Sequence, residues 1–414
     1  MLRLTSSSRS SLLLASIALA ALAACGDDSS GDTPPDAAPT VTPDAGTPPL
    51  LEPPPAGQGL QLTMTTRLEA GVEAEHCKFV KLPAGAEPLW VNRDEVRYGT
   101  GSHHFLLYAT SYTEIPTHKD DGTPVDTSKV FDCSDGATNG WSVTKLIGGS
   151  QNGVEGDSML RFPPDVAVKL PAGSVLLMNA HYINATDDAL EPQVFINLWT
   201  IPAAQVAQEG DLLFLYNPFI KVAKNGTGRA RWRCPVKHDI TIANVQSHMH
   251  RRGVGYEATV VGQAPFYVGS EWQNVQVKRF EPGMVVHAGE TFDYHCDYQN
   301  PQDHDVYQGP RSTDEMCMLI GSYYPRDAET ASCSDADGVP AGDWVGNGTA
   351  TCAATWTCFQ GALGQGGSGL KGLTDCIDKA SPDVSVESSA LVRCLFRTGD
   401  PSMCTSEVSA CAAK

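Results

Sequence analysis

The chain has 414 residues, a formal net charge of −19 and a hydrophobic content of 41%. The negative charge predicts a well-solvated surface and argues against a nucleic acid as partner. The length allows more than one domain with a hydrophobic core of its own.

Residues 1–24 have the features of a secretory signal. Arg3 and Arg9 are the only charged residues there, and the apolar run that follows them is too short to cross a membrane as a helix. Small residues stand immediately before Cys25, as in a bacterial lipobox. We therefore expect cleavage before Cys25 and lipidation of its thiol, with an ordinary signal and an unrelated cysteine as the alternative.

Residues 25–57 are rich in Pro, Asp, Thr, Ala and Ser and predict a disordered tether. No later stretch reaches the ~18 apolar residues of a spanning helix, so we expect membrane contact only through the N-terminal lipid. Gly26 lacks the aspartate that retains some lipoproteins at the inner membrane. This favours an exported protein on the outer membrane of a bacterial envelope, on its periplasmic or surface side.

Residues 58–345 consist of short β-type runs, such as 174–182 and 194–199, separated by turn sequences such as Pro171-Ala-Gly. No long helical period interrupts them. The pattern predicts an all-β architecture of two tandem antiparallel, jelly-roll-like β-sandwiches, over residues 58–205 and 206–345.

The first predicted sandwich contains two histidine motifs, Gly-Ser-His103-His104 and Asn-Ala-His181-Tyr. Neighbouring residues on a regular strand point to opposite faces, so His103 and His104 can share an ion only at a strand end or a bulge. His181 follows an apolar strand, where a core histidine is the simpler explanation. Neither motif is convincing on its own.

The second predicted sandwich contains Gln-Ser-His248-Met-His250 and Asp-Glu-Met316-Cys. Residues two apart on a strand share a face, so His248 and His250 can reach one ion. A surface histidine pair and a core methionine are the simpler explanations for the two motifs taken singly.

Residues 346–414 differ from the rest of the chain, because they carry six cysteines and helix-like segments. The chain has thirteen cysteines, and an even number remains once Cys25 is set aside for lipidation. In an exported chain we expect disulfides, which would stabilise this small, Cys-rich, helical tail. A metal cluster is the alternative, and the connectivity stays open.

The order of the four motifs resembles the copper type II ascorbate-dependent monooxygenases, the family of dopamine β-monooxygenase and the peptidylglycine α-hydroxylating enzyme. The resemblance spans about residues 60 to 340. The motifs that carry it are His103-His104, His181-Tyr182, His248-x-His250, Glu315-Met316-Cys317 and Tyr323-Tyr324-Pro325.

The resemblance implies two copper ions per chain, one in each sandwich, facing each other across a solvent-filled cleft. His103, His104 and His181 would bind an electron-transfer copper. His248, His250 and Met316 would be the catalytic residues and bind the copper that meets dioxygen. Ligand chemistry agrees, since imidazoles hold both oxidation states of copper and a thioether favours Cu(I).

The resemblance also implies three disulfides in the sandwiches and a reductant as co-substrate. The reductant would be ascorbate or another one-electron donor. The implied disulfides are Cys77–Cys133, Cys234–Cys333 and Cys296–Cys317.

Three positions depart from the amidating members of the family. Gln246 stands where those enzymes have the arginine that pairs with the substrate's carboxylate, and a neutral amide cannot replace a bidentate guanidinium. Met318 and Ile320 stand where they have an asparagine and a tyrosine. We therefore expect a neutral or apolar substrate rather than a peptide carboxylate.

The sequence thus predicts a copper-dependent monooxygenase that hydroxylates a C–H bond of a small molecule with dioxygen. A surface lipoprotein that binds copper without catalysis is the alternative. A structural or adhesive surface protein with a vestigial site is a third hypothesis.

Overall fold

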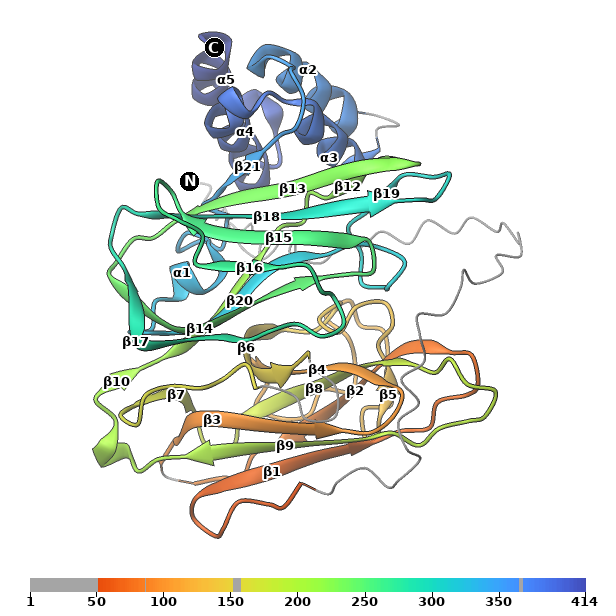
Figure 1. The fold of residues 1–414 in the computed structure, drawn as a ribbon, viewed down its shortest axis with the longest axis vertical. Helices are drawn as coiled ribbons and strands as arrows, with labels where there is room; N and C mark the ends of the chain where they lie inside the picture. The colour runs from red at the N-terminus through yellow and green to blue at the C-terminus, as the bar shows by residue number, and fades with distance from the viewer. Residues whose placement is uncertain (1–50, 86, 152–157, 365–367) are drawn as a thin grey trace, which may run out of the picture.

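The computed structural model describes residues 51–85, 87–151, 158–364 and 368–414. Three bodies are stacked along its long axis: a first β-sandwich, a second β-sandwich and a small group of helices at the C-terminal end (Figure 1). The all-β class with a helical C-terminal tail is confirmed. The predicted signal, Cys25 and most of the predicted tether lie outside the described residues.

The first sandwich consists of two five-stranded sheets. Its inner sheet, which faces the second sandwich in Figure 1, has β8 at its centre, and all but the last residue of β8 are buried. In order across the inner sheet the strands are β5 (Phe131–Asp132), β2 (Glu73–Lys81), β8 (Val175–Ile183), β4 (Ser102–Thr110) and β6 (Val143–Ser150). The outer sheet has β1 (Gly59–Thr65), β9 (Gln193–Thr200), β3 (Leu89–Tyr98), β7 (Val166–Leu170) and β10 (Gln208–Glu209).

Both ends of the first sandwich differ in detail from the predicted ranges. Residues 51–57, assigned to the tether by composition, are bound to the sandwich: Leu51 is buried and its carbonyl accepts from the Gln61 side chain at 2.6 Å. At the other end, β10 still pairs with β7. The chain therefore passes to the second sandwich after Glu209, where β11 begins at Asp211.

The second sandwich has a four-stranded sheet that faces the first sandwich and a five-stranded sheet that faces the helices (Figure 1). The four-stranded sheet is β11 (Asp211–Tyr216), β20 (Cys317–Tyr324), β14 (Ile240–Met249) and β17 (Lys278–Val286). The five-stranded sheet is β16 (Tyr267–Gly269), β15 (Gly253–Val260), β18 (Thr291–Asn300), β13 (Gly226–Pro235) and β21 (Asp343–Val345). A short pair, β12 (Lys221–Val222) with β19 (Val306–Tyr307), and α1 (Ala328–Ser332) complete it.

The two sandwiches are packed against each other along a broad interface. Leu212, Met318 and Ile320 of the second sandwich are buried in the hydrophobic cluster of the first. Across the same interface, Lys145 pairs with the buried Asp211 at 3.1 Å. Apolar burial and a shielded ion pair together make this a closed interface.

The tail contains α2 (Cys352–Leu363), α3 (Gly369–Lys379), α4 (Ser385–Thr398) and α5 (Thr405–Ala412). Three disulfides join these helices: Cys352–Cys411, Cys358–Cys376 and Cys394–Cys404. The tail also shares one hydrophobic cluster with the second sandwich, where the Phe396 ring of α4 lies 6.4 Å from the rings of Phe219 and Trp344, centroid to centroid. Disulfides and a shared core therefore compensate for the tail's small size. Among the described residues no helix is long and apolar enough to cross a membrane.

Candidate metal centre

Strands β4 and β8 bring the three histidines of the first sandwich together, and we call His103, His104 and His181 the first histidine group. The β4–β8 pairing shifts its register between Ser102 and His104, which provides the bulge that adjacent ligands need. The ring centroid of His181 lies 5.4 Å from that of His103 and 5.0 Å from that of His104. A local irregularity thus turns two neighbouring side chains toward one partner.

Strand β14 carries the second histidine group, His248 and His250, with ring centroids 5.3 Å apart. Strand alternation places both rings on one face. Met316 directly precedes β20, in which Cys317 is paired with Met249 of β14. The strand register therefore places Met316 beside the end of β14, where His250 stands.

The two histidine groups touch each other across the sandwich interface. The His104 and His248 ring centroids are 5.6 Å apart, in an edge-to-face arrangement. Trp272 of the second sandwich covers His103, with centroids 5.1 Å apart. The solvent-filled cleft implied by the resemblance is therefore wrong for this structure, because buried side chains from both sandwiches fill the interface.

Three of the five rings are oriented by a hydrogen bond from one ring nitrogen. His181 donates from Nε2 to Glu73 Oε1 at 2.9 Å, and His250 donates from Nδ1 to the carbonyl of Asp314 at 3.2 Å. His248 donates from Nδ1 to the side-chain oxygen of Gln151. Such partners fix the tautomer and the orientation of metal-binding imidazoles.

The remaining ring nitrogens fit the chemistry of a metal ligand. The Nδ1 atoms of His104 and His181 and the Nε2 atom of His250 are buried and have no hydrogen-bond partner. A buried polar atom without a partner carries a free-energy penalty of about 1–3 kcal/mol, so three in one cluster call for a missing ligand. Among the described residues, however, no three His, Cys, Asp or Glu side chains already converge on one point. The rings pack edge to face, and ion binding would require them to rotate.

Burial keeps the rings neutral, as metal ligands must be. Burial, together with nearby imidazoles, lowers the pKa of His103 and of His248 to about 3. The same causes, burial first, move the pKa values of His104 and His250 well below the usual range. All four rings therefore have free lone pairs near neutral pH.

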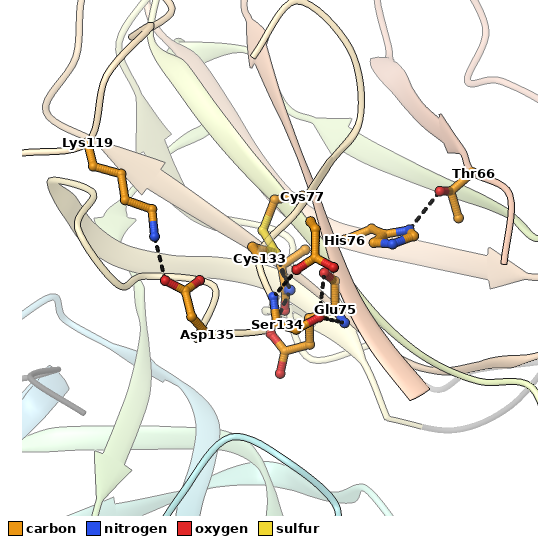
Figure 2. Close-up of a disulfide and its surroundings, with 10 residues drawn as sticks. Thr66, Glu75, His76, Cys77, Lys119, Cys133, Ser134 and Asp135 are labelled. Atoms are coloured by element: carbon orange, nitrogen blue, oxygen red, sulfur yellow. Dashed lines mark hydrogen bonds and ion pairs between the residues drawn. A yellow bond between two sulfur atoms is a disulfide. The ribbon is translucent and has the colours of Figure 1, made fainter. Parts of the chain in front are cut away.

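A cavity of about 280 Å³ lies beside the first histidine group. Two of its lining residues, Glu75 and Ser134, lie next to the Cys77–Cys133 disulfide (Figure 2), where the Ser134 hydroxyl accepts from the backbone N–H of Glu75. Burial raises the pKa of Glu75 to about 7. The lining residues are Glu73, Ala74, Glu75, Ser134, His181, Pro310, Arg311 and Thr313.

The three positions that depart from the amidating enzymes lie at the sandwich interface. Gln246 is fully buried on the same face of β14 as the second histidine group, and neither its amide oxygen nor its amide nitrogen has a partner. It stands opposite Ile320, and His248 stands opposite Met318. Both apolar side chains pack into the first sandwich rather than toward open solvent.

The sandwiches contain the disulfides Cys77–Cys133, Cys234–Cys333 and Cys296–Cys317. These are the three pairs that the resemblance implies. The third fixes the residue after Met316 to β18 and limits how far that segment can move.

Comparison with known protein families matches one part of the chain. Residues 227–339 match the family model "copper type II ascorbate-dependent monooxygenase, C-terminal domain". The match begins in β13 and ends after α1, so it contains the second histidine group, Met316 and two of the sandwich disulfides. The similarity to a copper- and ascorbate-dependent family accordingly lies within the second sandwich.

Other comparisons add no functional information. The chain is similar to PNGase F, a glycosylasparaginase from Flavobacterium meningosepticum, with 7% identity, coverage of 64% of this chain and 94% of that one, and a TM-score of 0.28. It is also similar to the major capsid protein P2 of bacteriophage PM2, with 9% identity, coverage of 63% and 97%, and a TM-score of 0.24. No curated protein matches the sequence.

Sequence reasoning missed four residues that contact the histidines or their supports: Glu73, Gln151, Trp272 and Ser312. Each comes from a segment distant in sequence from the ring it serves. Glu73 begins β2 and Gln151 follows β6, and neither stands in a motif. No local signal could have identified them.

Proposed function

We propose that the protein is a copper-dependent monooxygenase that hydroxylates a C–H bond of a small neutral or apolar substrate. Dioxygen would be the oxidant, and ascorbate or another one-electron reductant the donor. The observation that carries the proposal is the cluster of five imidazoles, four of them buried, in which three buried ring nitrogens have no hydrogen-bond partner. The family match over the second sandwich supports it.

The two groups would have different tasks. The first histidine group would hold an electron-transfer copper, and the second, with Met316, a copper that meets dioxygen. Bound there, the two ions would supply the electron transfer and the oxygen chemistry. In the balanced reaction, one oxygen atom enters the C–H bond, the other leaves as water with two protons, and the donors supply two electrons.

The chain's residues would prepare and protect this chemistry. Glu73, Gln151 and the Asp314 carbonyl orient the rings, and the closed interface excludes water from between the groups. The cavity beside His181 gives a small donor a place next to the first group.

Gln246 supports a substrate without a carboxylate. Its buried amide has both a donor and an acceptor unpaired, on the face of β14 that carries the second histidine group. A neutral polar group of the substrate could satisfy it, whereas a carboxylate would need a guanidinium. We expect Gln246→Arg to shift preference toward carboxylate-bearing analogues, measured as a ratio of kcat/KM values.

Product formation under labelled dioxygen tests the proposed function. Purified protein loaded with copper and supplied with ascorbate would be incubated with cell-envelope extract, and products carrying one labelled oxygen would be identified by mass spectrometry. Label in a product that is missing without ascorbate supports the proposal. Binding of two copper ions without any labelled product across amines, peptides and alkyl aromatics would instead favour a copper-binding lipoprotein, and failure to bind copper a vestigial site.

The location on the cell envelope is a separate part of the proposal. Cys25 would carry the lipid that anchors the protein, with residues 26–50 as tether. Cys25→Ser should move the protein from the membrane to the soluble fraction of lysed cells. Retention of the variant in the membrane fraction would contradict the anchor.

A further inference from the structure

We propose that Glu73 is a positioning residue that joins the two histidine groups, by holding the His181 ring and the segment that leads to Met316 with one carboxylate. This inference rests on the proposed function for its catalytic meaning. Its geometry is independent of bound metal.

The Glu73 carboxylate accepts three hydrogen bonds from both sandwiches. Its Oε1 atom accepts from Nε2 of His181 and from the backbone N–H of Ser312, each at 2.9 Å. Its Oε2 atom accepts from the Ser312 hydroxyl at 2.8 Å. Although burial opposes ionisation, these bonds hold the pKa of Glu73 at about 2, so the group is a carboxylate near neutral pH.

Residues 309–316, which we call the bridging loop, connect Ser312 to the second histidine group. The loop is closed on itself by hydrogen bonds from Gly309 N to Glu315 O at 3.2 Å and from Asp314 N to Arg311 O at 2.9 Å. It ends at Met316, whose carbonyl accepts from the Tyr298 hydroxyl at 2.7 Å. A shift of Ser312 is therefore transmitted to the end of the loop.

The bridging loop also orients His250 directly. The carbonyl of Asp314 accepts from the His250 ring at 3.2 Å, and the Glu315 carboxylate accepts from the His250 backbone N–H at 3.1 Å. Three residues of the loop separate Ser312 from Met316. The bridging loop therefore contacts one ring of each group. It reaches His181 through Glu73, and it accepts directly from the His250 ring.

This arrangement predicts that the two groups depend on each other. Removing the Glu73 carboxylate frees the His181 ring and, at the same time, the first-sandwich anchor of the bridging loop. A ring's hydrogen-bond partner typically changes metal affinity or activity by about 10–100-fold. We therefore expect an effect on both histidine groups from Glu73, a residue of the first sandwich alone.

The first test is hydrogen exchange of the bridging loop in metal-free protein. Glu73→Ala and Ser312→Ala should each speed exchange of the peptide covering residues 309–316 by about tenfold, the change expected from loss of roughly 1.4 kcal/mol of anchoring. The double variant should add little to Glu73→Ala alone, because the hydroxyl contact that Ser312→Ala removes is already lost with the Glu73 carboxylate. The matched control is Glu69→Ala, whose exposed carboxylate pairs only with Arg67 in the described structure.

Rescue separates positioning from general destabilisation. Glu73→Gln keeps an oxygen that can accept from His181 and from the Ser312 backbone, so it should restore slow exchange. Unchanged loop exchange in Glu73→Ala would overturn the proposal, and so would a Gln variant as fast as the Ala variant. If Glu73→Ala does not fold, the exchange rate of residues 309–316 in Ser312→Ala decides instead. This substitution lies in a loop, and an unchanged rate would overturn the proposal.

The second test measures the copper spectrum and the turnover that depend on the histidine groups. In copper-loaded protein, Glu73→Ala should alter the Cu(II) spectrum of the first group and lower kcat about tenfold, with the substrate's KM unchanged. An unaltered spectrum would overturn the role at His181. Because exchange is measured without metal or substrate, absence of hydroxylation in the wild type would refute the proposed function while leaving the loop's anchoring to be judged separately.

Discussion

In the first sandwich, His181 donates its ring N–H to a carboxylate, whereas in the second sandwich His248 and His250 donate to uncharged oxygens of Gln151 and of the Asp314 backbone. A carboxylate partner increases the basicity of an imidazole and adds negative charge nearby, which favours the more highly charged Cu(II). Neutral partners and a thioether favour Cu(I). The contrast teaches that the two proposed copper sites differ in the hydrogen-bond partners of their histidines as well as in the ligands themselves.

The largest effect is expected from removing the thioether that distinguishes the second group. Met316→Ile should reduce hydroxylation to background while one copper stays bound at the first histidine group, because only the second loses a ligand. Copper per chain and labelled product are the measurements. Met284→Ile, at a partly buried methionine of β17, is the control, and full activity of Met316→Ile would remove Met316 from the site.

Removing a ligand of the first group should have the next largest effect. His181→Ala should slow ascorbate-dependent turnover by more than the roughly 10–100-fold typical of losing a ligand's partner, since the ligand itself is lost. The copper of the second group should remain. Loss of both coppers in a Cu(II) spectrum would show that the groups do not bind separately.

A smaller effect should follow from removing a neutral partner in the second group. Gln151→Leu leaves Nδ1 of His248 without its acceptor and should weaken copper binding there about tenfold, at the low end of effects for such partners. Competition with a copper chelator measures this. Gln276→Leu, an exposed glutamine of the second sandwich, should show no change, and equal affinities in both variants would contradict the role of Gln151.

The smallest effect concerns stability, where the sandwiches resemble each other. Burial raises the pKa of Asp94 in the first and of Glu315 in the second to about 7. Each folded-state pKa lies above its unfolded value, so the stabilisation present at low pH is lost as pH rises from about 4 to about 7. The free energy of unfolding should therefore fall over this range.

Asp94→Asn tests the contribution of the first sandwich. It should flatten the slope of unfolding free energy against pH by up to about 1.4 kcal/mol per pH unit, since one titrating group is removed. Urea unfolding at several pH values measures the slope. An unchanged slope, like that expected for the exposed Asp187→Asn, would show that Asp94 does not titrate in this range.

Much of the fold was readable from local patterns. Apolar alternation and turn sequences predicted β-strands at residues 174–182 and 194–199. The first range overlaps β8 almost completely, and the second lies within β9. The bulge required for His103 and His104 is present at the start of β4. The predicted tether was too long, because residues 51–57 bind to the sandwich through backbone carbonyls that composition does not reveal.

The sequence by itself determined the residue types of the candidate ligands and their order along the chain, because strand alternation and residue chemistry are local properties. Only the tertiary structure decided how the two groups meet. The closed interface, the contact of His104 with His248, and the supports Glu73 and Gln151 all join segments far apart in the chain. Such pairings arise from the packing of whole sheets, so no spacing in the sequence encodes them.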